Sequence, residues 1–166
     1  MFKFCDACGY HNNIIREVYG EGNLIAPIMV IGEAPGKDEN KTGRPFVGNS
    51  GKLLREVLNP ILSHCYITNV VKCFPFGTPT QDAINTCMNI HLVNQVKFIR
   101  PEAIILVGKI AERNFPRNIS KATIYSIYHP SYQLHGGMTK EKYKEHVATV
   151  LAPLFEKYSM QVPIFN

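Results

Sequence analysis

The sequence predicts an α/β fold in which helices cover both faces of a central four-stranded parallel sheet. Two observations support this prediction. Four short apolar runs rich in β-branched residues lie at residues 27–31, 65–71, 103–107 and 123–127, and segments with helical spacing lie between them. Strands that alternate with helices form a parallel sheet in a three-layer arrangement. The 166 residues contain no internal repeat, so we expect one domain over residues 1–166.

The helices are predicted from their caps and their apolar spacing. Ser50 is expected to cap the helix that follows it, and Thr80 to cap a long helix that ends before Pro101. A last helix is expected from about Thr139, and Pro153 should kink or end it because proline cannot donate an internal helix hydrogen bond.

The segments that follow the four strands carry groups that can contact a ligand. They read Gly-Glu-Ala-Pro-Gly at 32–36, Thr-Asn at 68–69, Gly-Lys at 108–109 and Tyr-His-Pro-Ser at 128–131. Because ligands bind beyond the carboxyl ends of parallel strands, we expect these segments to meet in one cleft. The first segment does not match a P-loop, which has four residues between its glycines and Ser or Thr after the lysine.

Composition limits the class of protein. Hydrophobic residues make up 45% of the chain and charged residues 19%, as in a folded globular protein. No apolar run approaches the roughly 20 residues that span a bilayer, and the first residues lack a signal-peptide pattern, so we expect a cytoplasmic protein without a membrane partner. The net charge of +5 suits a polyanion partner, although the basic residues are spread along the chain.

Four of the five cysteines form two spaced pairs. Cys5 and Cys8 are separated by two residues, and Cys73 and Cys87 by thirteen. In a reducing cytoplasm such pairs are more often metal ligands than disulfides, and four thiolates suit either zinc or an iron–sulfur cluster. Cys65 lies inside an apolar strand and is interpreted as a buried hydrophobic residue.

Several motifs together resemble the family-4 uracil-DNA glycosylases. The resemblance is carried, in the family's order, by GEGNLIAPIMVIGEAPGKDENKTGRPFVGNSGKLL, ITNVVKCFPF, TPTQDAINTC, IRPEAIILVGKIAERNF and YHPSYQL, and it covers the chain from Cys5 to about Leu134. It implies a uracil-DNA glycosylase-like fold and a monofunctional enzyme of base excision repair. Such an enzyme flips uracil out of DNA and hydrolyses its N-glycosidic bond, which leaves an abasic site.

The resemblance implies roles for three residues that chemistry also favours. Phe46 would stack on uracil, although core packing is the commoner fate of phenylalanine. The amide of Asn69 would pair with uracil N3–H and O4, a pattern that cytosine reverses. His129 would donate a hydrogen bond to uracil O2, where negative charge develops. For Asn69 and His129 the alternative is a side chain that stabilises its own turn.

The loop after the first strand is implied to complete the base site. Glu33 would hold or polarise the attacking water, and Glu39 would lie near the C5 edge of the base and help to exclude thymine. Backbone amides near Ala34 and Gly36 would contact uracil O2, since glycine permits close approach. Ala34 stands where the best-known uracil glycosylases have aspartate, an absence typical of family 4, so the group that activates the water stays open.

The resemblance also implies a cofactor and a DNA contact. Cys5, Cys8, Cys73 and Cys87 match the four ligands of a structural [4Fe–4S] cluster. Residues 131–137 match the loop that enters the DNA helix, with Leu134 as the wedge, Tyr132 second and Ser131 beside them.

The partner is then uracil-containing DNA, single- or double-stranded, bound by a monomer. The alternatives are a glycosylase of the same fold for another damaged or modified base, or a non-catalytic iron–sulfur module that binds DNA.

Overall fold

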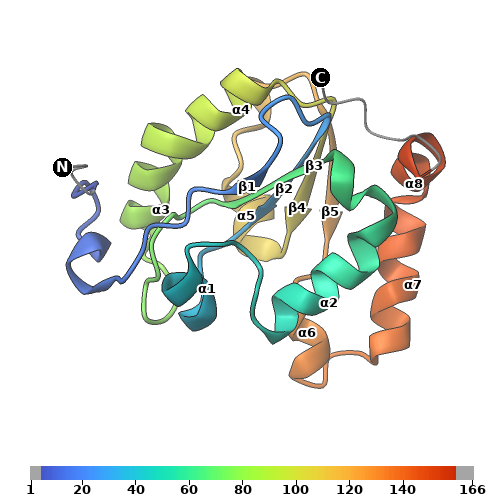
Figure 1. The fold of residues 1–166 in the computed structure, drawn as a ribbon, viewed down its shortest axis with the longest axis horizontal. Coiled ribbons are helices and arrows are strands. Elements are labelled where there is room, and N and C mark those ends of the chain that lie inside the picture. The colour runs from blue at the N-terminus through green and yellow to red at the C-terminus, as the bar shows by residue number, and fades with distance from the viewer. Residues whose placement is uncertain (1–4, 160–166) are drawn as a thin grey trace.

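The structure, a computed structural model, describes residues 5–159 and is built around one five-stranded sheet (Figure 1). The strand order is β1-β3-β2-β4-β5. The strands are β1 (Glu21–Gly22), β2 (Ile28–Gly32), β3 (Cys65–Asn69), β4 (Ala103–Val107) and β5 (Thr123–Ile127). Strands β2 to β5 are parallel, which confirms the predicted α/β class.

The predicted number of strands was too small by one. Strand β1 pairs with β3 in antiparallel orientation, with Glu21 opposite Ile67. It has only two residues, one of them glycine, so it carries no alternation or apolar run that would identify a strand from sequence. The central four-stranded parallel sheet therefore has a short antiparallel edge.

Helices and single turns connect the strands. The α-helices are α1 (Lys37–Thr42), α2 (Asn49–Leu58), α3 (Gln81–Cys87), α4 (Val93–Ile99), α5 (Lys109–Asn114), α6 (Ser131–Leu134), α7 (Lys140–Val150) and α8 (Ala152–Tyr158). The 3₁₀ turns are η1 (Tyr10–Asn13), η2 (Asn59–His64) and η4 (Arg117–Ile119), and η3 (Met88–Leu92) is a π turn.

The helix predictions hold with two corrections. The Thr80 hydroxyl accepts the N–H of Ala83 and caps α3, as predicted. The long helix that follows is interrupted by the π turn η3 between α3 and α4. Ser50 is not a cap, because α2 begins at Asn49 and the carbonyl of Gly48 accepts its first internal hydrogen bond.

The last helices of the described residues follow their prediction. The Thr139 hydroxyl accepts the N–H of Lys142 and caps α7. Helix α7 ends at Val150, and Pro153 lies in the first turn of α8, where its missing N–H costs no internal hydrogen bond.

Two hydrophobic clusters pack on opposite faces of the sheet and make it three layers. On one face, alternate residues of the strands pack against α2, α7 and α8; on the other face they pack against α3, α4 and α5. Every residue of the three inner strands β2, β3 and β4 is buried, as expected when helices cover both sides of a parallel sheet. Cys65 belongs to the first cluster and is buried, as interpreted from the sequence.

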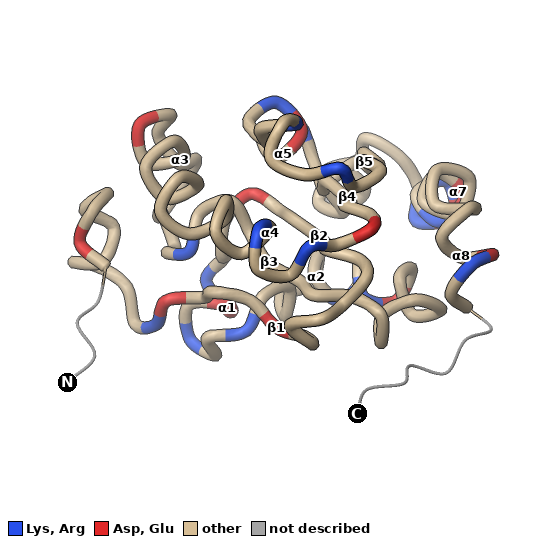
Figure 2. Tube along the Cα trace, turned by 90° about the horizontal axis from the view of Figure 1, so that it is seen from above, with Lys and Arg blue, Asp and Glu red and all other residues tan. Residues whose placement is uncertain are grey.

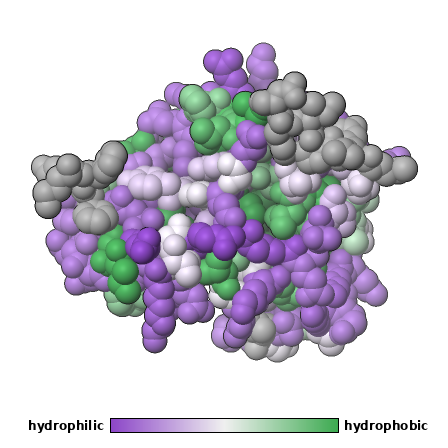
Figure 3. Space-filling model, in the orientation of Figure 1, coloured by the Kyte–Doolittle hydropathy of each residue, from purple (hydrophilic) through white to green (hydrophobic). Residues whose placement is uncertain are grey.

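Charged and apolar residues are mixed over the surface. Basic and acidic residues are interspersed over the trace (Figure 2). Hydrophilic residues cover most of the face seen in Figure 3, with smaller hydrophobic areas between them. Within residues 5–159, no helix combines the length and the apolar character that crossing a membrane requires.

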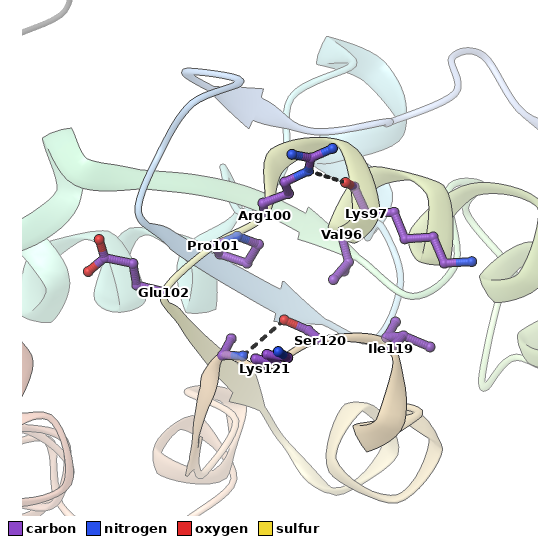
Figure 4. A pocket seen from close by; sticks show the side chains of 9 residues that line it. Val96, Lys97, Arg100, Pro101, Glu102, Ile119, Ser120 and Lys121 are labelled. Atoms are coloured by element: carbon purple, nitrogen blue, oxygen red, sulfur yellow. Dashed lines mark hydrogen bonds between the residues drawn. The ribbon is translucent and has the colours of Figure 1, made fainter.

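One concavity of about 610 Å³ lies at the amino ends of β4 and β5 (Figure 4). Lys97, Arg100 and Lys121 line it together with Glu102. Ligands of parallel sheets bind at the carboxyl ends of the strands. This concavity lies at the opposite edge of the sheet, so it is not the expected cleft.

Candidate active site and cysteine site

The residues predicted for base recognition meet at the carboxyl edge of the sheet. Gly32 ends β2 directly opposite Asn69, which ends β3. His129 follows β5, and its ring centroid lies 6.4 Å from that of Phe46, with an angle of 35° between the planes. Folding thus brings together three side chains that are far apart in sequence, and two of them, Asn69 and His129, belong to the strand-end segments that were expected to meet.

Gly32 leaves the space in which these side chains meet. A Cβ atom built on this glycine would overlap the Phe46 ring and lie 2.5 Å from Asn69 Oδ1. Gly108, which follows β4, makes similar room for His129, because a Cβ there would lie 3.0 Å from the Cβ of His129. The glycines at two strand ends therefore permit the close approach of the site residues.

Phe46 is held in an uncommon backbone conformation. Its φ angle is +53°, in the left-handed region that non-glycine residues rarely adopt. Arg55 of α2 donates to its carbonyl at 2.9 Å and to that of Pro45 at 2.7 Å, while a Cβ at Gly51 would overlap its main chain. The ring is buried, so Phe46 packs on the core as well as facing the site.

Glu39 supports the loop that carries Phe46. Its carboxylate accepts main-chain N–H groups from Val47 at 2.9 Å, Gly48 at 3.0 Å and Gly36 at 3.1 Å. The side chain is buried, so its charge is compensated by these donors. What the structure establishes for Glu39 is therefore a bracing role, and its predicted place at the C5 edge of the base stays a prediction.

The remaining loop residues line the start of α1. Glu33 and Ala34 are half-buried, and Gly36 precedes the helix at its N-cap. Burial raises the pKa of the Glu33 carboxyl above its ordinary value. The carbonyl of Glu33 accepts the N–H of Val71 at 2.9 Å, which ties the loop to the segment after β3.

Hydrogen bonding fixes the tautomer of His129. The main-chain N–H of Ser131 donates to Nδ1 at 3.1 Å, and the Ser131 hydroxyl lies 2.7 Å from the same atom. Burial lowers the pKa of His129, and the nearby Glu39 acts in the opposite direction. The neutral ring therefore carries its proton on Nε2, which is free to donate toward a ligand.

The predicted DNA-entering segment forms α6. Tyr132 is 48% exposed and stacks on Tyr128, with 5.4 Å between centroids, while Ser131 faces His129. Leu134 ends the helix, and its side chain lies outside the described part of the structure.

A cavity of about 670 Å³ adjoins this segment. Lys109, Tyr132 and His129 are among the residues that line it.

Sequence reasoning missed three residues that contact the predicted site segments. Arg55 supports Phe46 as described above. His146 accepts the N–H of Tyr128, beside the catalytic candidate, at 3.3 Å. Lys72 is buried under Asn69. The signal for Arg55 was the glycine one helical turn before it, since glycine inside a helix is unfavourable unless a backbone approaches closely.

The four predicted ligand cysteines line one common cavity. Cys5 and Cys8 come from the segment before η1, Cys73 from the segment after β3, and Cys87 from the end of α3. All four thiols are free, and Glu17, Tyr19 and His91 share the lining. A set of four thiols around one cavity fits the donor chemistry of a zinc ion or an iron–sulfur cluster.

Burial changes the acidity of two of the four thiols. Burial raises the pKa of Cys73 to about 12 and that of Cys87 to about 11. Within residues 5–159, no three or more His, Cys, Asp or Glu side chains are arranged to hold a metal ion.

Comparison with known proteins agrees with the geometry. The family model of the uracil DNA glycosylase superfamily matches residues 19–152. A type-4 uracil-DNA glycosylase of Archaeoglobus fulgidus is 35% identical, with 84% of this chain and 83% of the relative covered. That of Saccharolobus solfataricus is 33% identical, with 92% and 83% covered.

Other relatives are matched over a smaller share of their length. The type-4 enzyme of Pyrobaculum aerophilum is 38% identical over 68% of this chain and 60% of its own. The matched family model covers most of the chain, including every strand and the segments that carry Phe46, Asn69 and His129. The chain therefore belongs to the uracil DNA glycosylase superfamily.

Proposed function

We propose that this protein is a uracil-DNA glycosylase that hydrolyses the bond between uracil and deoxyribose and leaves an abasic site. The observation that carries the proposal is the convergence of Phe46 and Asn69 at Gly32, with the His129 ring beside that of Phe46. An aromatic face, an amide and a neutral imidazole donor are the groups that an extruded uracil requires for stacking, reading and departure. The type-4 uracil-DNA glycosylases named above support the same activity.

In the proposed reaction, each side chain has one task. Phe46 stacks on the flipped base, and the Asn69 amide pairs with N3–H and O4. As the glycosidic bond breaks, negative charge moves to uracil O2, where the Nε2–H of His129 donates. Glu33 holds the water that attacks the sugar, and its half-buried carboxylate is the ionisable group closest in sequence to Gly32.

The direct test is excision from DNA. Single- and double-stranded oligonucleotides that contain uracil are incubated with the protein, and abasic sites are cleaved with alkali. We expect cleavage at uracil and none at cytosine or thymine. Cleavage only at another base, such as hypoxanthine or 5-hydroxymethyluracil, would assign that base instead, and binding without turnover would indicate a DNA-binding module.

The raised pKa of Glu33 predicts a pH dependence. If ionised Glu33 activates water, kcat/KM should fall as the pH drops through its folded-state pKa, which lies above the ordinary 4.5. Glu33→Gln should lose this acidic limb together with most activity. If kcat/KM of the variant still falls at the same low pH, the group that titrates is not Glu33.

The ionisation of Glu33 should affect folding stability in the opposite direction to activity as the pH changes. The folded state binds the Glu33 proton more tightly than the unfolded state, so this group's contribution to stability decreases as the pH rises from 4.5 through the folded-state pKa. Glu33→Gln should therefore unfold at higher temperature than the parent at pH 7. The difference should disappear below pH 4.5, where both side chains are neutral.

We also propose that Cys5, Cys8, Cys73 and Cys87 hold a [4Fe–4S] cluster. The support is their shared cavity and the enzyme type of the relatives. When bound, the cluster would supply a structural cross-link and no chemistry to the hydrolysis, which requires no electron transfer. The cysteines would tie the N-terminal segment to the end of α3.

The cluster proposal predicts a coloured protein. Purified without oxygen, it should be brown, absorb broadly near 400 nm and contain about four irons per chain. Chelation of the iron should lower the unfolding temperature, because the cross-link between the two segments is lost. Stoichiometric zinc without iron would contradict the assignment.

Uracil-containing DNA is the proposed partner, in single- or double-stranded form. We propose that the protein is one domain and acts as a monomer in the cytoplasm. Its free cysteines agree with this location, because a reducing compartment preserves thiols.

A further inference from the structure

Lys72 is a buried lysine, 1% exposed, between the base-reading residue and the cysteine site. It follows Asn69 by three residues and precedes Cys73. Its ammonium donates to the main-chain oxygen of Asn69 at 2.6 Å, to the Thr68 hydroxyl at 2.7 Å and to Gln95 Oε1 at 2.6 Å. These bonds use all three N–H groups of the ammonium, which is how such a group is tolerated inside a protein.

The lysine supplies a hydrogen-bond donor on the side of β3 where the pairing with β1 has ended. Strand β1 begins at Glu21, opposite Ile67, so the last two residues of β3 extend past it. The carbonyl of Asn69 lies in this unpaired stretch and receives Lys72 instead. The hydrogen-bond network continues to the carbonyl of Tyr19. This carbonyl accepts hydrogen bonds from the Thr68 hydroxyl and from the side-chain amide of Gln95, the two groups that also bind the lysine.

The main chain of Lys72 is itself fixed on the side of the cysteine site. Its N–H donates to Cys87 Sγ at 3.3 Å, and its carbonyl accepts the N–H of Val18 at 2.7 Å. The side chain therefore extends from an anchored backbone to the end of β3. The lysine therefore restrains the main-chain carbonyl of Asn69. Gly32 packs against the side-chain oxygen of the same residue.

We propose that Lys72 is a positioning residue for base recognition and acts through Asn69, an inference that rests on the proposed function. The Asn69 amide must keep its orientation to pair with N3–H and O4 of uracil. A misplacement of about 1 Å in such a site lowers the rate about 10²-fold. Without the ammonium, the Asn69 carbonyl is buried without its donor, and its peptide group is held from the β2 side alone, where the N–H of Val70 donates to the carbonyl of Gly32.

The test is a double-mutant cycle in single-turnover excision from uracil DNA. Lys72→Met, which keeps the length of the side chain, should slow excision roughly 10–100-fold in the parent. In an Asn69→Ala background it should change the rate less than threefold, because the group it positions is gone. The effect should fall on the maximal single-turnover rate rather than on the affinity for DNA, since phosphate contacts supply most of the affinity.

A control separates positioning from general destabilisation. Leu92→Ala removes a fully buried side chain from the core cluster on the α4 face and should have the same effect in both backgrounds. If Lys72→Met fails to fold, Lys72→Gln replaces it in the cycle and should show the same dependence on Asn69 with a smaller loss. Equal rate losses with and without Asn69 would overturn the inference.

The proposed function is tested separately by the parent protein. If the parent does not excise uracil, the function itself fails. If the parent excises uracil and the cycle is additive, only the role of Lys72 fails.

Discussion

Replacing His129 with alanine is expected to slow single-turnover excision of uracil by about 10²–10³-fold, the usual loss when one donor to a developing negative charge is removed. The donor is the Nε2–H, because the main chain of Ser131 donates to Nδ1 and burial keeps the ring neutral. Charge on uracil O2 exists mainly in the transition state, so the loss should fall on the chemical step. Affinity for uracil DNA should change far less.

Two comparisons make this result specific. DNA that carries 5-fluorouracil, whose anion forms more readily, should be affected less by His129→Ala than uracil DNA. Ser131→Ala keeps the main-chain N–H that fixes the tautomer and should lower the rate less than tenfold, although it removes the hydroxyl 2.7 Å from Nδ1. Equal losses on both bases would leave His129 with a role in its own turn alone.

Gly32→Ala is expected to lower the excision rate about 10²-fold or more while the protein still folds. The added methyl would overlap the Phe46 ring and crowd Asn69 Oδ1, which lies 2.5 Å from the position of the new atom. Two recognition groups would have to move together, and about 1 Å of misplacement is enough for a loss of this size. Thermal unfolding and single-turnover excision should be measured on the same preparation.

Gly48→Ala is the matched control for this prediction. Gly48 lies in the same region of the chain, its φ of −71° suits alanine, and the nearest atom to the new methyl would be Asp38 Oδ2 at 3.3 Å. We expect its activity to stay within threefold of the parent. If Gly32→Ala were equally active, the base would not lie between Phe46 and Asn69.

The α/β class and the edge of the sheet that carries the site could be predicted from the sequence. Apolar runs mark buried parallel strands, and the polar groups that end them must share one edge because parallel strands point the same way. The cap Thr80 and the start of the last helix near Thr139 were also predictable, since a hydroxyl that bonds the first helical turn is a local interaction. The motifs that resemble family 4 named the site residues, and the family match confirms the family to which they belong.

Interactions between segments distant in sequence could not be predicted in this way. Strand β1 exists only because Glu21 and Gly22 meet β3, and the cap of α2 moved to Gly48 in a loop held by Glu39. Neither feature leaves a local pattern, because the partner of each hydrogen bond lies elsewhere in the chain.

The sequence by itself determined the layers, the parallel strands and the candidates Phe46, Asn69 and His129, because periodicity and motifs are local properties. Only the tertiary structure decided which groups hold them. Arg55 reaches the carbonyl of Phe46, and Gln95 of α4 binds the Lys72 ammonium beside Asn69. A side chain finds such a partner through the packing of whole elements, and that packing is set by the two hydrophobic clusters rather than by any short stretch of residues.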